Sequence, residues 1–270
     1  MKKKFITYGS NTFVHSAKRI IEEAQSLNIF DETQRYDYKD LPLSMQSSPL
    51  FLDKKKGGFW VWKAYVIYDS LSKLKDGDLL VYSDSGCELK NPDGWKIELE
   101  ILTHTDAIFY QYRENKDYAF SKFNPNYNDS PKLKYWIKKS LRETFLPIFD
   151  NNTWLEKNKL MAGFIIVKKT HDTMMLIKQW LDVMMFRPDL VVDPLLFEKQ
   201  ESDFSSHRHD QSILSIIVRY YEDKINILVK DELSESDYPD QILKASRRLD
   251  HVPENKLKSQ LKKLYYRIKK

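Results

Sequence analysis

The segment His207-Arg208-His209-Asp210-Gln211 places five side chains with binding or proton-transfer chemistry directly before an apolar helix pattern. Two histidines spaced by two lie on the same side of an extended segment, so one imidazole could ligate a metal while the other contacts a phosphate. Asp210 alone is explained by helix capping. Capping does not explain two of the six histidines of the chain, nor Arg208 and Gln211. We therefore expect a ligand site at the beginning of this helix, where anions are also favoured.

A second set of polar residues lies in the segment 79–86, which reads Leu-Leu-Val-Tyr-Ser-Asp-Ser-Gly. Its first half is a continuous apolar run, and its second half is polar. Asp84 ends this expected strand, and Glu88 lies four residues further on. Carboxylate oxygens suit Mg²⁺ or Mn²⁺, which can bridge two phosphates. Capping of a turn is the simpler interpretation, because any Asp-Ser-Gly sequence can do it. The alternative hypothesis is a metal site, with Asp84, Glu88, His207 and His209 as the ligands.

Lys63 follows Trp60 and Trp62 in a third segment of interest. A solvated lysine is the default interpretation, and an ammonium directed at a diphosphate is the alternative. The chain has only seven glycines, and neither the Walker pattern nor G-x-G-x-x-G occurs. This argues against P-loop and classical Rossmann nucleotide sites.

The elements that position these residues alternate between strands and helices. Strands are expected at 3–11, 35–42, 76–86, 106–112, 161–169 and 225–230, and helices at 13–27, 60–74, 170–185 and 210–221. Several strands are apolar on both faces, which favours a mostly parallel sheet with helices on both faces. Ligands bind at the carboxyl ends of strands in such sheets. The polar residues that flank the strands, from Tyr8 to Asn11, from Ser83 to Glu88 and around Gly163, are therefore the candidates for a site.

Composition limits the class of protein. The 270 residues are 41% hydrophobic, enough for a sizeable core, and the formal net charge of +5 does not by itself indicate nucleic acid. A single cysteine, Cys87, excludes a disulfide within the chain and fits a reducing cytoplasm. No apolar run matches a signal peptide or the ~20 residues of a membrane span. We expect a cytoplasmic protein that is soluble or rests on a surface.

The segment at residues 255–270 has an amphipathic pattern with seven basic residues. Leu257, Leu261, Leu264 and Ile268 form one apolar stripe. A basic amphipathic helix of this kind is typical of attachment to an anionic membrane surface. Docking on the core of the protein, with the basic face in solvent, is the alternative, and both interpretations stay open.

Three of these motifs, in this order, resemble those of nucleotide-sugar glycosyltransferases of the GT-A fold: Tyr-Ser-Asp-Ser-Gly at 82–86, Met-Ala-Gly at 161–163 and His-Asp-Gln at 209–211. The chain looks like bacterial capsule and lipopolysaccharide transferases related to the family-8 galactosyltransferase and glycogenin group. The resemblance covers about residues 4–230. It implies a single Rossmann-like GT-A catalytic domain at 1–230, followed by a C-terminal extension with a basic amphipathic helix at 231–270.

The resemblance also implies roles for residues. Asp84 matches the first Asp of an Asp-x-Asp motif, and Gly86 stands where the second Asp is usual, which puts the Mn²⁺ or Mg²⁺ cofactor in doubt. Asp210 and Gln211 match an Asp-Gln pair beside the anomeric carbon and are, with Asp84, the expected catalytic residues. The expected donor-binding residues are Tyr8, Ser10, Asn11, Lys63, Ser83, Ser85, Ala162, Gly163 and Arg208.

The implied activity is transfer of a hexose from a nucleoside-diphospho-sugar, with UDP as the expected nucleotide, to a glycan or lipid-linked acceptor in surface polysaccharide synthesis. Retention of the anomer is expected if Gln211 lies beside the reacting centre; a general base at Asp210 would instead invert it. The partners are then donor, acceptor and an anionic inner membrane face, with no nucleic acid. A metal-dependent phosphodiester hydrolase or nuclease is one alternative, and a catalytically silent nucleotide-sugar-binding module is another.

Overall fold

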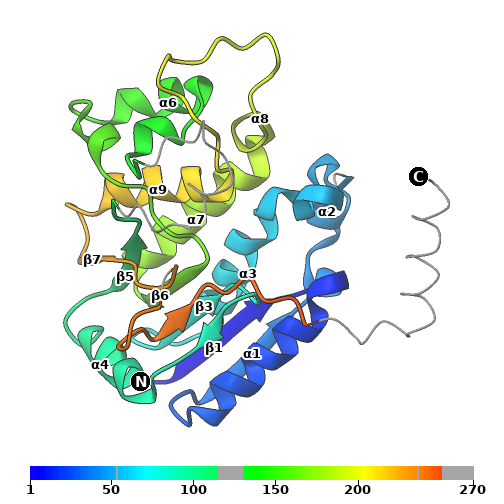
Figure 1. Cartoon of the computed structure of the whole chain (residues 1–270), viewed down its shortest axis with the longest axis vertical. Coiled ribbons are helices and arrows are strands. Elements are labelled where there is room, and N and C mark those ends of the chain that lie inside the picture. The colour runs from blue at the N-terminus through cyan, green and yellow to red at the C-terminus, as the bar shows by residue number, and fades with distance from the viewer. Residues whose placement is uncertain (53, 115–129, 236, 251–270) are drawn as a thin grey trace, which may run out of the picture.

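The computed structural model describes residues 1–52, 54–114, 130–235 and 237–250 (Figure 1). A six-stranded sheet with the order β2-β1-β3-β6-β5-β7 forms its centre. The strands are β1 (Lys3–Tyr8), β2 (Glu32–Tyr36), β3 (Leu79–Ser83), β5 (Ala107–Gln111), β6 (Phe164–Lys168) and β7 (Ile227–Asp231). All pairings are parallel except those of β6, which runs antiparallel to both β3 and β5. The predicted α/β class with a mostly parallel sheet is confirmed.

The reversed direction of β6 decides which residues meet at the site. Phe164, at the start of β6, pairs with Ser83 at the end of β3. The residues before β6 therefore lie at the same edge of the sheet as the residues after β1 and β3. Ala162 and Gly163 reach this edge by preceding their strand, whereas Asp84 reaches it by following one.

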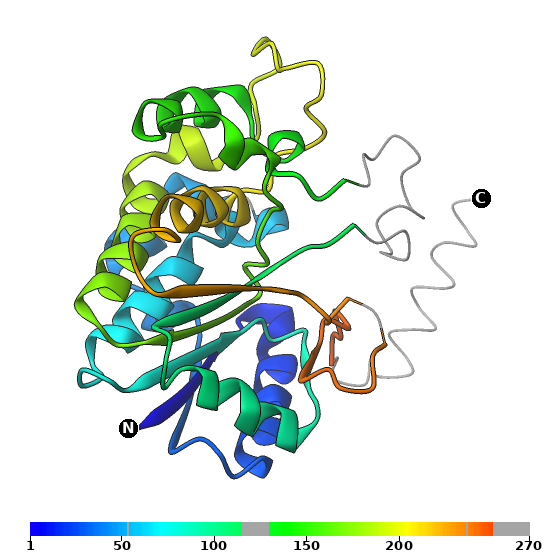
Figure 2. The same ribbon diagram turned by 90° about the vertical axis from the view of Figure 1, so that its left-hand side faces the viewer.

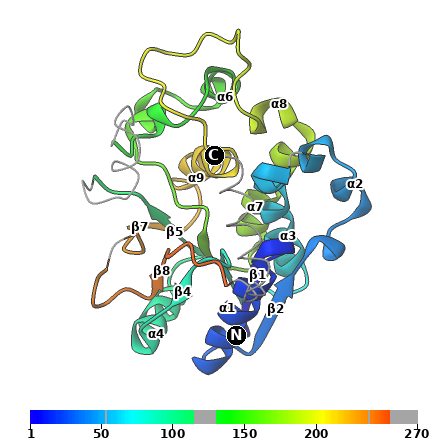
Figure 3. The ribbon, with the colours of Figure 1, turned by 45° about the vertical axis from the view of Figure 1, so that its right-hand side comes forward.

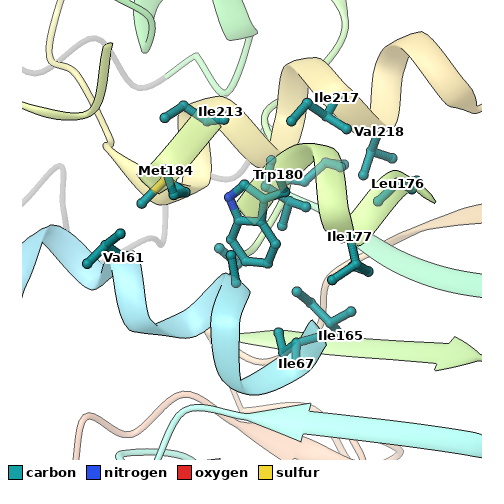
Figure 4. Close-up of a cluster of buried hydrophobic side chains, with 14 of the residues drawn as sticks. Val61, Ile67, Ile165, Leu176, Ile177, Trp180, Met184, Ile213, Ile217 and Val218 are labelled. Carbon is teal, nitrogen blue, oxygen red and sulfur yellow. The ribbon is translucent and has the colours of Figure 1, made fainter. Parts of the chain in front are cut away.

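Helices cover both faces of the sheet, as the apolar strands predicted. On one face lie α1 (Val14–Ser26) and α4 (Pro92–Ile101), and on the other lie α3 (Val61–Ser72), α7 (His171–Phe186) and α9 (Asp210–Tyr221). Alternate residues of a strand serve the two cores, so Phe5 packs with α1 and Ile6 packs on the opposite side. In the second core, Trp180 of α7 is fully buried among side chains of α3, β6 and α9 (Figure 4).

The helix α4 was not predicted from the sequence, and neither were several shorter elements. They are α2 (Leu43–Gln46), α6 (Lys139–Phe145), α8 (Pro188–Val191), β4 (Glu88–Leu89), β8 (Leu243–Lys244) and 3-10 turns at Asn11–Phe13, Tyr38–Asp40, Pro49–Leu52, Lys54–Trp60, Leu133–Tyr135, Leu146–Ile148 and Thr153–Glu156. The strand predicted at 35–42 is misplaced, because β2 runs from Glu32 to Tyr36 and Asp37 then caps a 3-10 turn in the predicted segment.

Residues 231–250 return to the body of the domain. The strand β8 pairs with β4, and Trp95 of α4 donates its indole N–H to the Ile242 carbonyl at 3.0 Å. This segment lies beside α4 (Figure 2), and β4, β8 and α4 are grouped together in a third view (Figure 3). The predicted boundary after residue 230 assigned residues 231–250 to a C-terminal extension. In the structure these residues pack on the catalytic-domain side of that boundary, against β4 and α4. The basic amphipathic helix predicted at residues 255–270 falls outside the described residues.

Within the described residues, no helix is both long and apolar enough to cross a membrane.

Candidate functional site

A buried lysine links two of the three predicted catalytic residues. The Lys63 ammonium lies 3.2 Å from Asp84 Oδ1 and 3.0 Å from Asp210 Oδ2. Lys63 comes from the first turn of α3, Asp84 follows β3, and Asp210 is the first residue of α9. The side chains of Lys63 and Asp210 are 4% and 7% exposed, whereas that of Asp84 is 39% exposed. Asp84 is therefore the carboxylate that a ligand from solvent would reach.

The charges in this trio are coupled. Burial alone would lower the pKa of Lys63, but the carboxylates of Asp210 and Asp84 outweigh it and the net pKa is raised. Burial raises the pKa of Asp210 although the Lys63 ammonium opposes this. The charged form of Lys63 is favoured because two carboxylates face its ammonium. The charged form of Asp210 is favoured less, because Asp210 shares that one ammonium with Asp84. The ionised trio carries a formal charge of −1.

Asp84 is held in place by its neighbours. The Tyr82 hydroxyl donates to Asp84 Oδ1, and the Asp84 backbone N–H donates to the Gly163 carbonyl at 2.8 Å. A Cβ added at Gly163 would lie 2.9 Å from Asp84 Oδ2, which is too close for any other residue type to fit without a shift. The sequence predicted Gly163 but missed Tyr82. The signal was present, because Tyr82 and Asp84 are two apart along a strand and project to the same side.

The start of α9 is tied to the same edge of the sheet. The Gln211 side-chain amide donates to the Leu160 carbonyl at 2.6 Å, and the Leu160 N–H donates to Ser215 Oγ at 2.9 Å. Asp210 does not take the N-cap position predicted for it. His209 occupies that position, and the Asp210 side chain turns to Lys63. Asp210 therefore contributes its charge to the site.

The two histidines bind backbone carbonyls at the end of α8. His207 Nε2 lies 3.0 Å from the Leu190 carbonyl, and His209 Nδ1 lies 2.8 Å from the Val191 carbonyl. The buried ammonium of Lys138 donates to the neighbouring carbonyls of Asp189 and Val192. Burial holds the pKa of His207 well below its usual range, so this imidazole is neutral at pH 7. These side chains satisfy the carbonyls that a helix leaves unpaired at its end.

The predicted metal ligands Asp84, Glu88, His207 and His209 do not converge. Glu88 forms an ion pair with Lys90 at 2.8 Å, and both imidazoles are engaged by α8. In the described parts of the chain, no group of three or more His, Cys, Asp or Glu side chains could hold a metal ion. Asp84 and Asp210 both face the Lys63 ammonium, which already occupies the position between them. This arrangement does not fit a divalent cation.

The predicted donor-binding residues at the first strands differ in exposure. Tyr8 stacks on Trp62 with ring centroids 3.9 Å apart and donates its hydroxyl to Ser10 Oγ at 3.2 Å. Asn11 is exposed and Ser10 is partly exposed, so both are open to a ligand. Four other predicted donor-binding residues are buried, namely Tyr8, Ser83, Ser85 and Ala162.

Arg208, two residues before α9, packs on an aromatic ring. Its guanidinium stacks over the Trp136 ring at 5.0 Å, and the Lys159 ammonium lies 4.0 Å from the centroid of the same ring. Burial lowers the pKa of Arg208, and it lowers the pKa of Lys159 to about 7. Lys159 was not predicted, because it lies in an irregular segment whose sequence gives no periodic signal.

No protein-family model and no curated protein sequence matches the chain. Among solved structures, one that is similar is a glycosyltransferase involved in the glycosylation of the major capsid of PBCV-1, with 10% identity, a TM-score of 0.45, and coverage of 87% of this chain and 84% of that one. Another is mouse xyloside xylosyltransferase 1 in its apo form, with 9% identity, a TM-score of 0.40, and coverage of 86% and 85%. Likeness at this level leaves the function to be inferred from the site itself.

Proposed function

We propose that this protein is a glycosyltransferase that transfers a hexose from a nucleoside-diphospho-sugar to an acceptor hydroxyl. The observation that carries the proposal is the trio at the edge of the sheet, where an accessible carboxylate, Asp84, adjoins the Lys63 ammonium and the buried Asp210. Carboxylates accept hydrogen bonds from sugar hydroxyls, and an ammonium attracts a diphosphate. Both chemistries are needed to bind a sugar nucleotide, and this edge of an α/β sheet is the usual place for such a ligand.

The donor would lie across the strand ends. Ser10 and Asn11 are the exposed polar residues after β1, where the nucleoside would bind. The diphosphate would lie against Lys63 and the N-terminus of α9, whose dipole favours anions. Asp84 would then accept hydrogen bonds from hydroxyls of the transferred sugar. UDP is the proposed nucleotide, and a glycan or a lipid-linked sugar at the inner membrane face is the proposed acceptor.

In the proposed reaction, the acceptor oxygen forms a bond to the anomeric carbon while the bond from that carbon to the diphosphate breaks. The diphosphate leaves with the electron pair, and the acceptor proton passes to a phosphate oxygen. Stabilisation of the leaving charge is the main catalytic contribution. Asp210 is buried and ion-paired with Lys63, which keeps its carboxylate away from an acceptor hydroxyl. This supports retention of the anomer, with Gln211 beside the reacting centre.

A phosphodiester hydrolase would need convergent metal ligands, which the described residues do not assemble. A silent binding module has the same site without turnover. Donor binding and release of nucleoside diphosphate from the donor therefore have to be measured separately.

The test is a calorimetric titration with UDP, GDP and CDP and their sugars, using the native chain, Asp84→Asn and the control Glu88→Gln. Glu88 is also an acid near a strand end, but it pairs with Lys90. We expect one nucleotide sugar to bind, Asp84→Asn to weaken it at least tenfold, and Glu88→Gln to change it less than twofold. A thermal shift should accompany binding, equivalent to about 2.7 kcal/mol when the ligand is at 100 times Kd.

The proposal fails if no nucleotide binds, or if both variants bind as the native chain does. Binding without release of nucleoside diphosphate in the presence of glycan acceptors would indicate the silent module. An NMR assignment of the product anomer separates retention from inversion.

A further inference from the structure

The centre of the site is filled by a side-chain cation. We infer that the Lys63 ammonium takes the place of a divalent metal, so that donor binding needs no added cation. The two carboxylate oxygens that would ligate such a metal lie 3.0 and 3.2 Å from Lys63 Nζ. The inference rests on the proposed function for the identity of the donor, but its metal-binding consequence can be measured without any donor.

Lys63 is fixed in this position by its surroundings. Its side chain is 4% exposed, and the ammonium lies 5.8 Å from the ring centroids of Trp62 and Tyr82. The backbone before α3 is also constrained, because Phe59 and Trp60 have φ values of 52° and 58° in the left-handed region. An ammonium enclosed in this way, with cations attracted to the faces of both rings, does not leave its carboxylates easily.

Both Phe59 and Trp60 pack on His209, with ring centroids 5.1 and 5.7 Å away. His209 directly precedes Asp210, so the same contact sets the start of α3 and the start of α9. The positions of Lys63 and Asp210 are thereby fixed relative to one another. The ion pair between them is built into the packing of two helices.

The number of acidic groups agrees with a monovalent counter-ion. Gly86 stands where a second Asp would add another carboxylate, and Glu88 is paired with Lys90. Two carboxylates and one ammonium remain. An ammonium has three N–H donors, and two of them are directed at Asp84 and Asp210. The third is left for an oxygen of the donor diphosphate.

Removal of the ammonium should create a metal site that the native chain does not have. Asp210 Oδ2 is buried, and apart from Lys63 no described residue contacts it as a hydrogen-bond donor. Without Lys63, this carboxylate and Asp84 would face one another with no counter-ion. A small divalent cation binds carboxylate oxygens at about 2.1 Å, so each carboxylate would need to move by only ~1 Å to hold it.

The experiment uses Mn²⁺ as the probe, titrated by electron paramagnetic resonance and by thermal shift. The variants are Lys63→Ala, which empties the position, Lys63→Met, which fills it without charge, and the double variant Lys63→Ala/Asp84→Asn. We expect Lys63→Ala to bind Mn²⁺ at least tenfold more tightly than the native chain and to gain thermal stability from it. The double variant should lose this binding, and Lys63→Met should not acquire it.

In a second arm, the native chain is titrated with the nucleotide that binds best, with EDTA and then with Mn²⁺. We expect the two affinities to agree within twofold. An affinity that falls more than tenfold in EDTA, or tight binding of Mn²⁺ to the native chain, would overturn the inference, because a metal would then displace Lys63. A folded Lys63→Ala variant that ignores Mn²⁺ would also overturn it.

If Lys63→Ala fails to fold without metal, Mn²⁺ binding by the native chain decides the question. Failure of the proposed function has a different signature. No nucleotide would then bind under either condition, while the gain of Mn²⁺ binding in Lys63→Ala would remain.

Discussion

At the scale of single residues, burial sets the charge of Lys159. Its ammonium lies over the rings of Tyr112 and Trp136, and burial lowers its pKa to about 7 although Glu235 and Glu232 oppose this. In the unfolded chain the pKa is about 10.4. Between these values the unfolded state binds more protons than the folded state. The free energy of unfolding should therefore rise with pH across this window, by up to about 1.4 kcal/mol per pH unit from this group.

The prediction is measured as the difference in unfolding free energy between the native chain and Lys159→Met, by urea titration from pH 6.5 to pH 9.5. The free energy of unfolding of the native chain should rise relative to that of the variant as the pH rises, because Met has no proton to lose. Lys178→Met is the control, since Lys178 is exposed and pairs with Asp182. Parallel curves for the native chain and Lys159→Met would show that Lys159 keeps its proton in the folded state.

Residue types and positions beside strands and helix starts, together with the resemblance to GT-A transferases, selected Lys63, Asp84, Asp210 and Gly163 from the sequence, and the fold brings these four together. The histidines show where such reasoning stops. Two imidazoles beside a helix start are compatible with a metal, a phosphate or a backbone carbonyl. The choice depends on α8, which lies on the other side of a long loop and is too short to show a helical period.

At the scale of elements, the five strands of the sheet other than β2 and the helices α1, α3, α7 and α9 were predictable because each carries an apolar pattern. The direction of β6 was not, because an apolar run reads the same for parallel and antiparallel strands. Asp84 and Gly163 meet only because β6 is reversed. The sequence thus proposed Asp84 and Gly163, and the topology of the sheet determined which end of β6 lies beside Asp84.

The end of α8 gives a prediction at this scale. Lys138 is 2% exposed and donates to the carbonyls of Asp189 and Val192. Lys138→Met keeps the length of the side chain and leaves the carbonyls of Asp189 and Val192 without this donor. We expect a loss of about 1–3 kcal/mol in the free energy of unfolding. The matched control is Lys139→Met, because the next lysine is 38% exposed and pairs only loosely with Glu143, at 3.7 Å.

Urea unfolding of both variants measures this difference. Equal stability of Lys138→Met and Lys139→Met would contradict a stabilising role for the capped carbonyls. A larger loss in Lys138→Met, together with weaker nucleotide binding, would indicate that α8 also positions His209 and hence the start of α9.

At the scale of the whole molecule, residues far apart in the chain close around the site. Arg19 of α1 donates to the carbonyls of Ser85 and Cys87, at 3.0 and 2.8 Å, in the turn that follows Asp84. It also forms an ion pair with Asp250 at 2.7 Å. One guanidinium therefore joins α1, the turn after β3 and the segment that follows β8. The fork of five N–H donors makes this possible, and a lysine could not satisfy the same acceptors.

Arg19→Met should therefore destabilise the fold by about 2 kcal/mol, because it removes donors from two carbonyls and one of the two arginines that pair with Asp250. Arg19→Lys should recover less than half of this loss, whereas Arg187→Met, which removes only an exposed pair with Asp189, should stay within about 0.5 kcal/mol of the native chain.

Because Arg19 holds the turn beside Asp84, we also expect Arg19→Met to weaken nucleotide binding several-fold in a folded protein. Full recovery by Arg19→Lys would mean that charge alone matters there. Unchanged nucleotide binding in Arg19→Met would mean that Tyr82 and Gly163 fix Asp84 without help from the turn.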